Sequence, residues 1–438
     1  MTELVSASAA SARGSGRRTF LSLWLGQVIS LVGTRATAFA LGVWVFQQTG
    51  SATWFAAIAL ASNLPAILVS PLAGAWVDRT DRRRVMIGAD TLAALGSLAL
   101  LLLVATGHLA LWHLYAVATL ASLVGAFQFP AFSASVTLLL PKDQYARASG
   151  LVQLGRTGSD VVAPLLAGGL LGSFGLTGVI AVDLVTFLIA VTVLVLARVP
   201  SPPPPTERRS LWADAGSGWS WIRRRPGLLW LLGLIASFNL WLPLALVLTT
   251  PMVLGFTGVE ELGLVLGLGA AGALAGSFTL TAWGGPEGKV RGLLAFTPVL
   301  ALGLIVAGLK PSVPLTAAGL FLAMFAAPLI HGCSQAIWQR KVPPELQGRV
   351  FAVRRMIAQA TAPVAFLAAG PLADGVFGPL LAAGGSAVGS LGGLWGVGPG
   401  RGIGLLFALL GGLLLLTSVF AFAHRPLMAV EQDVPDAG

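Results

Sequence analysis

Residues 74–84 read GAWVDRTDRRR, and six of these eleven residues are charged, although an apolar run of membrane-spanning length lies on either side. Arg and Lys next to a hydrophobic span resist translocation, so a short Arg-rich loop stays in the cytoplasm. The stretch therefore predicts two transmembrane helices joined by a cytoplasmic loop.

The composition indicates a polytopic membrane protein. Of the 438 residues, 56% are hydrophobic and 10% are charged, which excludes a soluble domain with a charged surface. The net charge is +10, but the Arg residues form short clusters between apolar runs. We therefore expect the lipid bilayer as a partner, and no nucleic acid. The single Cys333 can form no intramolecular disulfide, and the first apolar run lacks a signal-peptide cleavage site.

Apolar runs long enough to span a bilayer predict twelve transmembrane helices. With both termini in the cytoplasm, 21 of the 27 Lys and Arg residues lie on the cytoplasmic side, as the positive-inside rule requires. The runs cover about 20–47, 52–77, 84–106, 111–139, 145–172, 176–197, 227–254, 261–283, 290–309, 313–339, 346–373 and 402–424.

A proline-rich segment, 200–205, divides the chain into two halves of six spans. The segment 211–222 after it predicts an amphipathic helix on the cytoplasmic leaflet. The predicted domains are a tail (1–18), a six-helix bundle (19–198), a linker (199–226), a second six-helix bundle (227–424) and a tail (425–438). The bundles are pseudo-symmetric, because three positions recur about 200 residues later in the same order. Pro141, Arg147 and Pro164 are matched by Pro343, Arg349 and Pro363.

The loop after the second span resembles the signature loop of the major facilitator superfamily through Gly74, Asp78, Arg79, Arg82 and Arg83. Several segments further resemble its macrolide-efflux and enterobactin-exporter branch. These are WLGQVISLVGT (24–34), TGSATWFAAIALASNLPAIL (49–68), DRTDRRRV (78–85) and KVPPELQGRVFAVRRMI (341–357).

The resemblance implies an all-α membrane fold and a monomeric secondary transporter of the bacterial inner membrane. Such a transporter works by alternating access and has no cofactor, since a proton gradient drives it. The resemblance also implies a gating latch: Asp78 lies near the N-terminus of span eleven, and Arg82 pairs with an acid inside the first half. A carboxylate gains free energy from a helix N-terminus only while the two are together. The latch would therefore favour the outward-facing state, although the Arg residues could serve orientation alone.

The chain departs from the family pattern in three places. Asp81 replaces the usual Gly of the loop, and the second half has an eroded counterpart, GGPEGKVR (284–291). Span four carries no Arg, unlike the proton-coupled drug antiporters, and has Gln128 and Pro130 in its polar region. A simple transfer of the antiporter proton relay to this chain is thereby weakened.

Charged residues inside spans are costly and mark candidate coupling sites. Arg156 and Asp160 are four residues apart in span five, so they share a helix face and can neutralise each other. They could form a structural ion pair, or Asp160 could exchange a proton while Arg156 tunes it. Asp183 and His331 are alternative proton carriers, the latter more often a packing residue. Asp90 is expected to join the Arg82 network.

Polar residues on otherwise apolar spans predict a substrate cavity. Gln27, Ser30 and Thr34 recur at i, i+3 and i+7 in span one, with Arg35 next to them. This mixed lining suits a bulky amphiphile better than a sugar. The remaining cavity candidates are Asn63, Gln128, Asn239, Trp241, Gln335, Trp338, Arg355 and Gln359.

No GxxxxGK[ST] motif for ATP and no HExxH or paired-Cys motif for a metal is present, so we expect no enzyme and no metal. The sequence predicts a proton-coupled antiporter that exports an amphiphilic drug, siderophore or peptide-like small molecule. An importer or lipid transporter of the same fold is the alternative. A non-transporting scaffold and a membrane-embedded enzyme are further ones.

Overall fold

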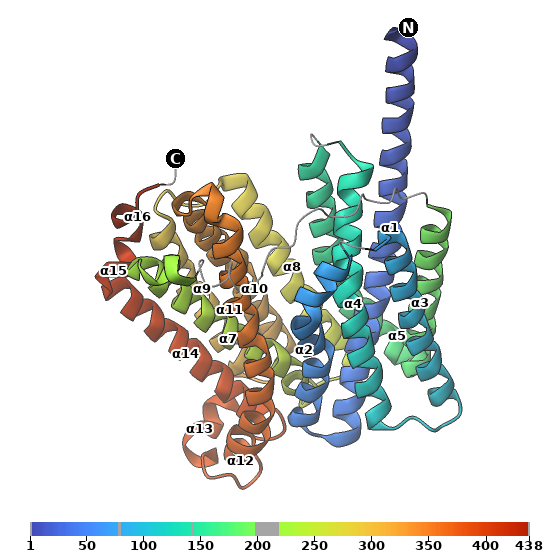
Figure 1. Cartoon of the computed structure of the whole chain (residues 1–438). Coiled ribbons are helices and arrows are strands. Elements are labelled where there is room, and N and C mark those ends of the chain that lie inside the picture. The colour runs from blue at the N-terminus through green and yellow to red at the C-terminus, as the bar shows by residue number, and fades with distance from the viewer. Residues whose placement is uncertain (1, 78–79, 142–143, 198–218, 437–438) are drawn as a thin grey trace. The chain divides into compact units, whose positions relative to one another are not determined.

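The computed structural model describes residues 2–77, 80–141, 144–197 and 219–436 (Figure 1). Side chains of residues 1–15 and of some helical positions, Gly74 and Gln359 among them, are not described. All regular structure in these ranges is helical. The chain divides into two compact units, one of residues 1–48 and 58–207, the other of residues 49–57 and 208–438. The predicted linker helix at 211–222 falls mostly outside the described residues.

The first unit is built from the helices that precede the linker. They are α1 (Thr2–Thr49), α2 (Ala52–Val77), α3 (Arg82–Ala105), α4 (Leu111–Leu139) and α5 (Tyr145–Leu196). The first residues of α2, 52–57, belong to the second unit. The 52 residues of α5 would extend about 78 Å as one helix, far more than a bilayer core of about 30 Å. Gly175, at φ 62° and ψ −166°, breaks the helix in a conformation that only Gly adopts readily. The two segments of α5 correspond to predicted spans five and six.

In its described residues the second unit contains six long helices and several short ones. The first five long helices are α7 (Pro226–Leu254), α8 (Val259–Trp283), α9 (Lys289–Leu309), α10 (Val313–Lys341) and α11 (Pro344–Gly370), followed by η2 (Pro371–Phe377), a π-helix. After these come α12 (Gly378–Leu381), α13 (Val388–Trp395), the long α14 (Arg401–Ala423), α15 (Arg425–Met428) and α16 (Val430–Asp433).

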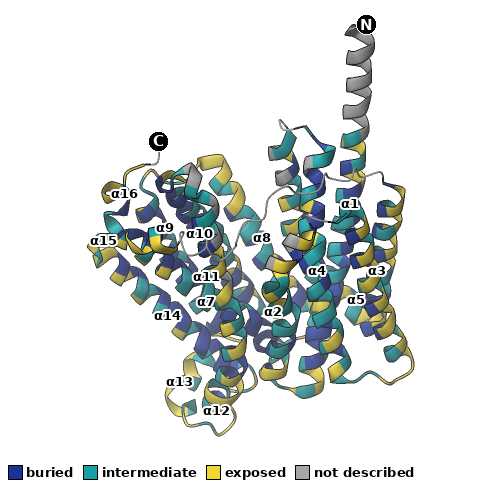
Figure 2. Ribbon diagram, viewed as in Figure 1, coloured by how far each residue is buried: buried dark blue, intermediate teal, exposed yellow. Residues whose placement is uncertain are grey.

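Eleven helices of the described chain are long and apolar enough to cross a membrane, and one of them, α5, contains two segments. The predicted all-α membrane fold is confirmed, while the exact count of twelve spans stays a prediction. Large apolar side chains are exposed along single helices: Leu92, Leu95 and Leu102 of α3 are about half exposed. Figure 2 shows exposed positions along α3. Such surface is stable in lipid and would promote aggregation in water.

The two units cap their third long helices differently. In the first unit Asp81 accepts hydrogen bonds from the backbone N–H groups of Arg83 and Arg84 (2.9 and 3.1 Å) at the start of α3. In the second unit the eroded loop offers only Gly288 as N-cap of α9. Glu431 of the C-terminal tail accepts instead from the N–H groups of Lys289 and Val290 (3.2 and 3.0 Å). Glu431 of the tail thus caps α9 as Asp81 of the loop caps α3.

Candidate functional site

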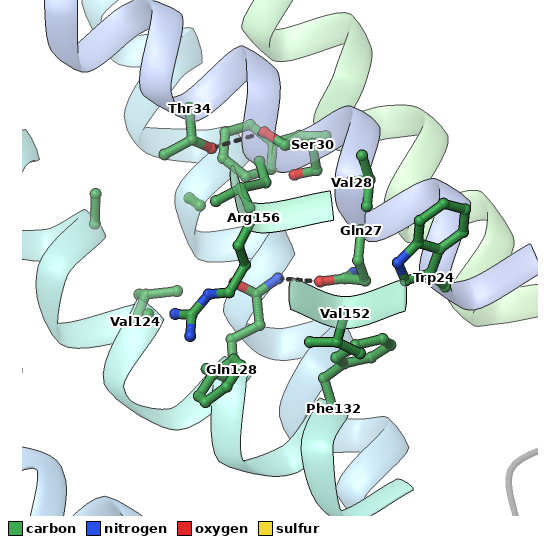
Figure 3. A pocket seen from close by; sticks show the side chains of 16 residues that line it. Trp24, Gln27, Val28, Ser30, Thr34, Val124, Gln128, Phe132, Val152 and Arg156 are labelled. Atoms are coloured by element: carbon green, nitrogen blue, oxygen red, sulfur yellow. Dashed lines mark hydrogen bonds between the residues drawn. The ribbon is translucent and has the colours of Figure 1, made fainter. Parts of the chain in front are cut away.

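A cavity of about 220 Å³ lies within the first unit, between α1, α3, α4 and α5 (Figure 3). Its walls are mainly apolar, and its polar groups come from a few side chains. It is lined by Trp24, Gln27, Val28, Ser30, Leu31, Thr34, Ala93, Ala121, Val124, Gly125, Gln128, Phe129, Phe132, Val152, Arg156 and Phe187. This combination of an apolar surface with few hydrogen-bonding groups is typical of sites for small organic molecules.

The helical spacing of span one places its polar stripe on this wall. Gln27, Ser30 and Thr34 all line the cavity, and the Thr34 hydroxyl donates to the Ser30 carbonyl (3.0 Å) (Figure 3). That bond satisfies the hydroxyl within its own helix. Gln128 of α4 faces the stripe, and its amide donates to the Gln27 side-chain oxygen (2.9 Å) (Figure 3).

Asp90 of α3 contacts the two glutamine side chains of the cavity lining. Its carboxylate is fully buried and accepts from Gln27 Nε2 (2.9 Å) and from Gln128 Nε2. The prediction that Asp90 belongs to the Arg82 network is wrong, because Arg82 donates to the Ala134 carbonyl (2.7 Å). Asp90 and Arg82 lie two turns apart on α3, and the nearby amides satisfy the carboxylate. The sequence contained both glutamines but no signal that joined them to Asp90.

Arg35 pairs with Asp160 through its Nη1 atom, and the same nitrogen donates to the Arg156 carbonyl. The direct partner of Asp160 is therefore Arg35, whereas Arg156 acts on this carboxylate through a Coulombic interaction without a salt bridge. The Arg156 guanidinium instead lies 3.9 Å from the centre of the Phe129 ring, over its face. The spacing rule for helix pairs fails here because a residue of another helix reaches the carboxylate first. Arg35 links α1 to α5 and does not line the cavity.

Asp183, in the second segment of α5, is buried and accepts from the Ser97 hydroxyl (2.7 Å) of α3. Gly33 of α1 lies against it, since a Cβ there would be 2.9 Å from its Oδ1 atom. The close helix approach thus leaves Asp183 in the packed interior, beside the cavity-lining Phe187 and not among the lining residues themselves.

A second polar cluster lies between α10 and α11 of the second unit. Arg354 donates to the Gln335 side-chain oxygen and to Ser334 Oγ (3.3 Å), and its guanidinium lies 5.6 Å from the Trp338 ring centre. Trp338 is fully buried. The sequence predicts Gln335 and Trp338 as cavity residues together with Arg355, whereas the structure places the adjacent Arg354 in this cluster. Arg355 is exposed, and nothing in a pair of adjacent arginines shows which one faces the neighbouring helix.

The other candidates are dispersed. Asn63 donates to the Ala59 carbonyl (2.8 Å) of its own helix, and the Asn239 carbonyl accepts from Thr361 (3.0 Å). Trp241 and His331 are partly buried in the second unit. The side chain of Gln359 lies outside the described residues.

The predicted latch also lies largely outside the described residues, because Gly74, Asp78 and Arg79 are not covered. Arg83 donates to the carbonyls of Leu194 (2.9 Å) and Val195 (2.5 Å) in the last turn of α5. A cation at a helix C-terminus is favourable. Among the described contacts, Arg82 and Arg83 therefore tie α3 to the backbone of α4 and α5. The predicted acidic partner of Arg82 is not found in this part of the chain.

The family model described as Major Facilitator Superfamily matches residues 23–366, most of the chain. The chain belongs to the major facilitator superfamily. The superfamily assignment agrees with the all-helical fold, and it makes the protein a membrane transporter.

Two proteins similar to this chain are named as efflux proteins. Macrolide efflux protein A of Streptococcus pyogenes is 26% identical over 375 residues, which cover 81% of this chain and 89% of that protein. Multidrug efflux pump Tap of Mycolicibacterium fortuitum is 27% identical over 354 residues, 78% of this chain and 86% of the pump. The predicted resemblance to macrolide-efflux proteins is confirmed. A bacterial homologue of the human lysosomal transporter Spinster, solved in an inward-facing conformation, shares the fold with a TM-score of 0.67 at 17% identity, covering 96% of this chain and 98% of its own.

Proposed function

We propose that this transporter is a proton-coupled antiporter of the bacterial inner membrane that exports an amphiphilic small molecule by alternating access. The similarity to macrolide and multidrug efflux proteins over about four fifths of the chain supports this direction of transport. Siderophores and peptide-like natural products fall within the same chemical class of substrate. In this proposal the chain acts as a monomer, and both termini lie in the cytoplasm.

The lining of the cavity in the first unit supports an amphiphilic substrate. Aromatic and aliphatic walls, such as Phe129, Phe132 and Leu31, offer apolar surface, and the Gln27 and Gln128 amides offer hydrogen bonds. A sugar would need denser polar contacts than these. A volume of about 220 Å³ accommodates one ring system of a larger amphiphile.

Everted membrane vesicles from cells that express the protein test the proposal. With an interior-acid proton gradient, the vesicles are expected to accumulate radiolabelled erythromycin or ethidium, and a protonophore should abolish the accumulation. Membranes without the protein set the background. Uptake that is absent, or that ignores the protonophore, would refute proton-coupled export, and gradient-driven uptake by right-side-out vesicles instead would establish an importer.

A matched pair of variants connects transport to the cavity. Gln128→Ala removes a cavity hydrogen-bonding group and is expected to lower the transport rate about three- to tenfold, the equivalent of one lost hydrogen bond. Gln432→Ala removes the same side chain from an exposed position of α16 and should transport at the wild-type rate. If Gln128→Ala and Gln432→Ala transport at the same rate, the substrate does not bind in this cavity.

A further inference from the structure

The Asp90 carboxylate is joined directly to two side chains of the cavity wall. Gln27 and Gln128 line the cavity and both donate to Asp90, which is fully buried and does not line the cavity itself. An ionised carboxylate inside a membrane domain is costly unless hydrogen bonds stabilise it. The two amides supply those bonds, so their orientation depends on the charge of Asp90.

Asp90 is held by neutral donors although charged groups surround it on the neighbouring helices. Arg82 and Arg83 of α3 donate to backbone carbonyls, Arg156 of α5 lies over Phe129, and Asp183 accepts from Ser97. Arg35 of α1 pairs with Asp160 of α5, and the titratable groups of α4 are His113 and Tyr115, near the N-terminus of that helix. No salt bridge of Asp90 occurs among the described residues, so protonation of this carboxyl breaks no ion pair.

We propose that Asp90 exchanges protons with a cationic amphiphile: the ionised carboxylate favours the cation in the cavity, and a proton on Asp90 expels it through the Gln27 and Gln128 amides. This inference rests on the proposed antiport function and names the substrate charge and the coupling residue. It replaces Asp160, whose carboxylate is already neutralised by Arg35.

The two protonation states present different groups to the cavity. In the ionised state both amide N–H₂ groups donate to Asp90, the Gln27 oxygen accepts from Gln128, and the negative charge of the carboxylate acts on the cavity. When one proton binds to a carboxylate oxygen, that O–H becomes a donor, and an amide must rotate to offer its oxygen. Its N–H₂ group then faces the cavity, and the negative charge is gone. Both changes disfavour a bound cation.

Competition of this kind is the thermodynamic requirement for antiport. If the cation binds the ionised state more tightly by some factor, the proton binds the cation-free state more tightly by the same factor. The proton leaves Asp90 as a hydronium ion when the next cation binds, so no other bond breaks.

Ethidium binding to the purified full-length protein in nanodiscs tests the inference, because ethidium keeps its charge at every pH used. Wild-type protein is expected to release protons on binding, as detected by a pH dye in weak buffer, and to bind ethidium more weakly as pH falls from 8 to 5.5. Asp90→Asn should release no protons and should bind about tenfold more weakly, without pH dependence. This loss lies within the usual range of coupling between sites.

Controls separate this role from a structural one. Asp433→Asn, at an exposed acid of α16, should behave as wild type, and Asp90→Glu should restore proton release. If Asp90→Asn does not elute as a monodisperse protein, the Gln27→Leu/Gln128→Leu double variant tests the same link. Without amide donors the midpoint of its pH profile should move to higher pH by about one unit.

Three outcomes would overturn the inference. The first is that Asp90→Asn releases protons at the wild-type level. The second is that proton release is lost in Asp160→Asn or in Asp183→Asn but not in Asp90→Asn. The third is that the Gln27→Leu/Gln128→Leu variant has the pH profile of the wild type. Each can occur while the wild-type protein still accumulates probes in everted vesicles, in which case only the coupling residue is wrong. Failure of the wild-type vesicles themselves would refute the proposed function.

Discussion

Replacing Gly276 with Ala tests how α8 packs on α10. A Cβ at Gly276 would lie 2.1 Å from the Phe325 carbonyl oxygen, and one at Gly272, a turn earlier, would lie 2.3 Å from the Phe321 oxygen. Ordinary contacts of a Cβ begin near 3.4 Å, so Gly276→Ala requires the helices to separate locally by about 1.3 Å. The obstacle is backbone and cannot rotate away, as small-residue packing in membranes predicts.

The destabilisation caused by the clash is best measured against a control glycine that has space for a Cβ atom. Gly412 of α14 has no heavy atom within 4 Å of a built Cβ, so Gly412→Ala gains the helix propensity of Ala, about 1 kcal/mol, without a clash. Gly276→Ala gains the same term and also incurs an overpacking cost of about 1–3 kcal/mol. The two variants should therefore differ by that cost, which corresponds to roughly 1–3 °C in the unfolding temperature of a chain of this length.

Thermal unfolding in detergent, followed by intrinsic tryptophan fluorescence, measures this difference. Adding Gly272→Ala to Gly276→Ala should cost less than the two single changes together, because one helix displacement relieves both clashes. If Gly276→Ala and Gly412→Ala unfold at the same temperature, α8 and α10 do not pack as closely as the structure shows.

Three further predictions concern polar contacts. Arg35→Gln and Asp160→Asn should show a coupling free energy of about 1 kcal/mol in a double-mutant cycle of thermal stability, because the pair is partly exposed; additive effects would argue against the ion pair. Glu431→Ala should destabilise the protein by about 0.5–2 kcal/mol through loss of the α9 cap, whereas Gln432→Ala next to it should change little. Hydrogen bonds from Lys341 and Arg340 lower the pKa of the Asp436 carboxyl below its ordinary 3.8. The ion pairs of Asp436 with these two residues, which attach the tail, are therefore complete above pH 3.8 and are lost as the pH falls below it. Pepsin should then cleave the wild-type tail faster as the pH drops, and Asp436→Asn should abolish that acceleration.

Local sequence predicted the fold well because membrane insertion is itself a local requirement. Each span must be apolar over about 20 residues, whatever it packs against. The chain therefore shows its helices in hydropathy alone, including the two segments on either side of Gly175. The polar stripe of Gln27, Ser30 and Thr34 was equally readable, since a helix places these positions on one face.

Partner choice could not be read in the same way. The i, i+4 rule favoured Arg156 for Asp160, yet Arg35 from α1 occupies that carboxylate and Arg156 stacks on Phe129. The position of Asp90 near the cytoplasmic end of span three favours the Arg82 network, yet the amide partners of Asp90 come from α1 and α4. Such contacts join residues 38 to 125 positions apart, which no local pattern encodes.

The sequence by itself determined the membrane class, the expected orientation and the superfamily, because hydropathy, positive charge and the signature loop act over short stretches of chain. Only the tertiary structure decided which acid faces the cavity amides, which arginine meets Gln335, and that Glu431 of the tail caps α9 in place of the eroded loop. These outcomes depend on how whole helix faces pack, and packing selects among polar partners that the sequence leaves equivalent.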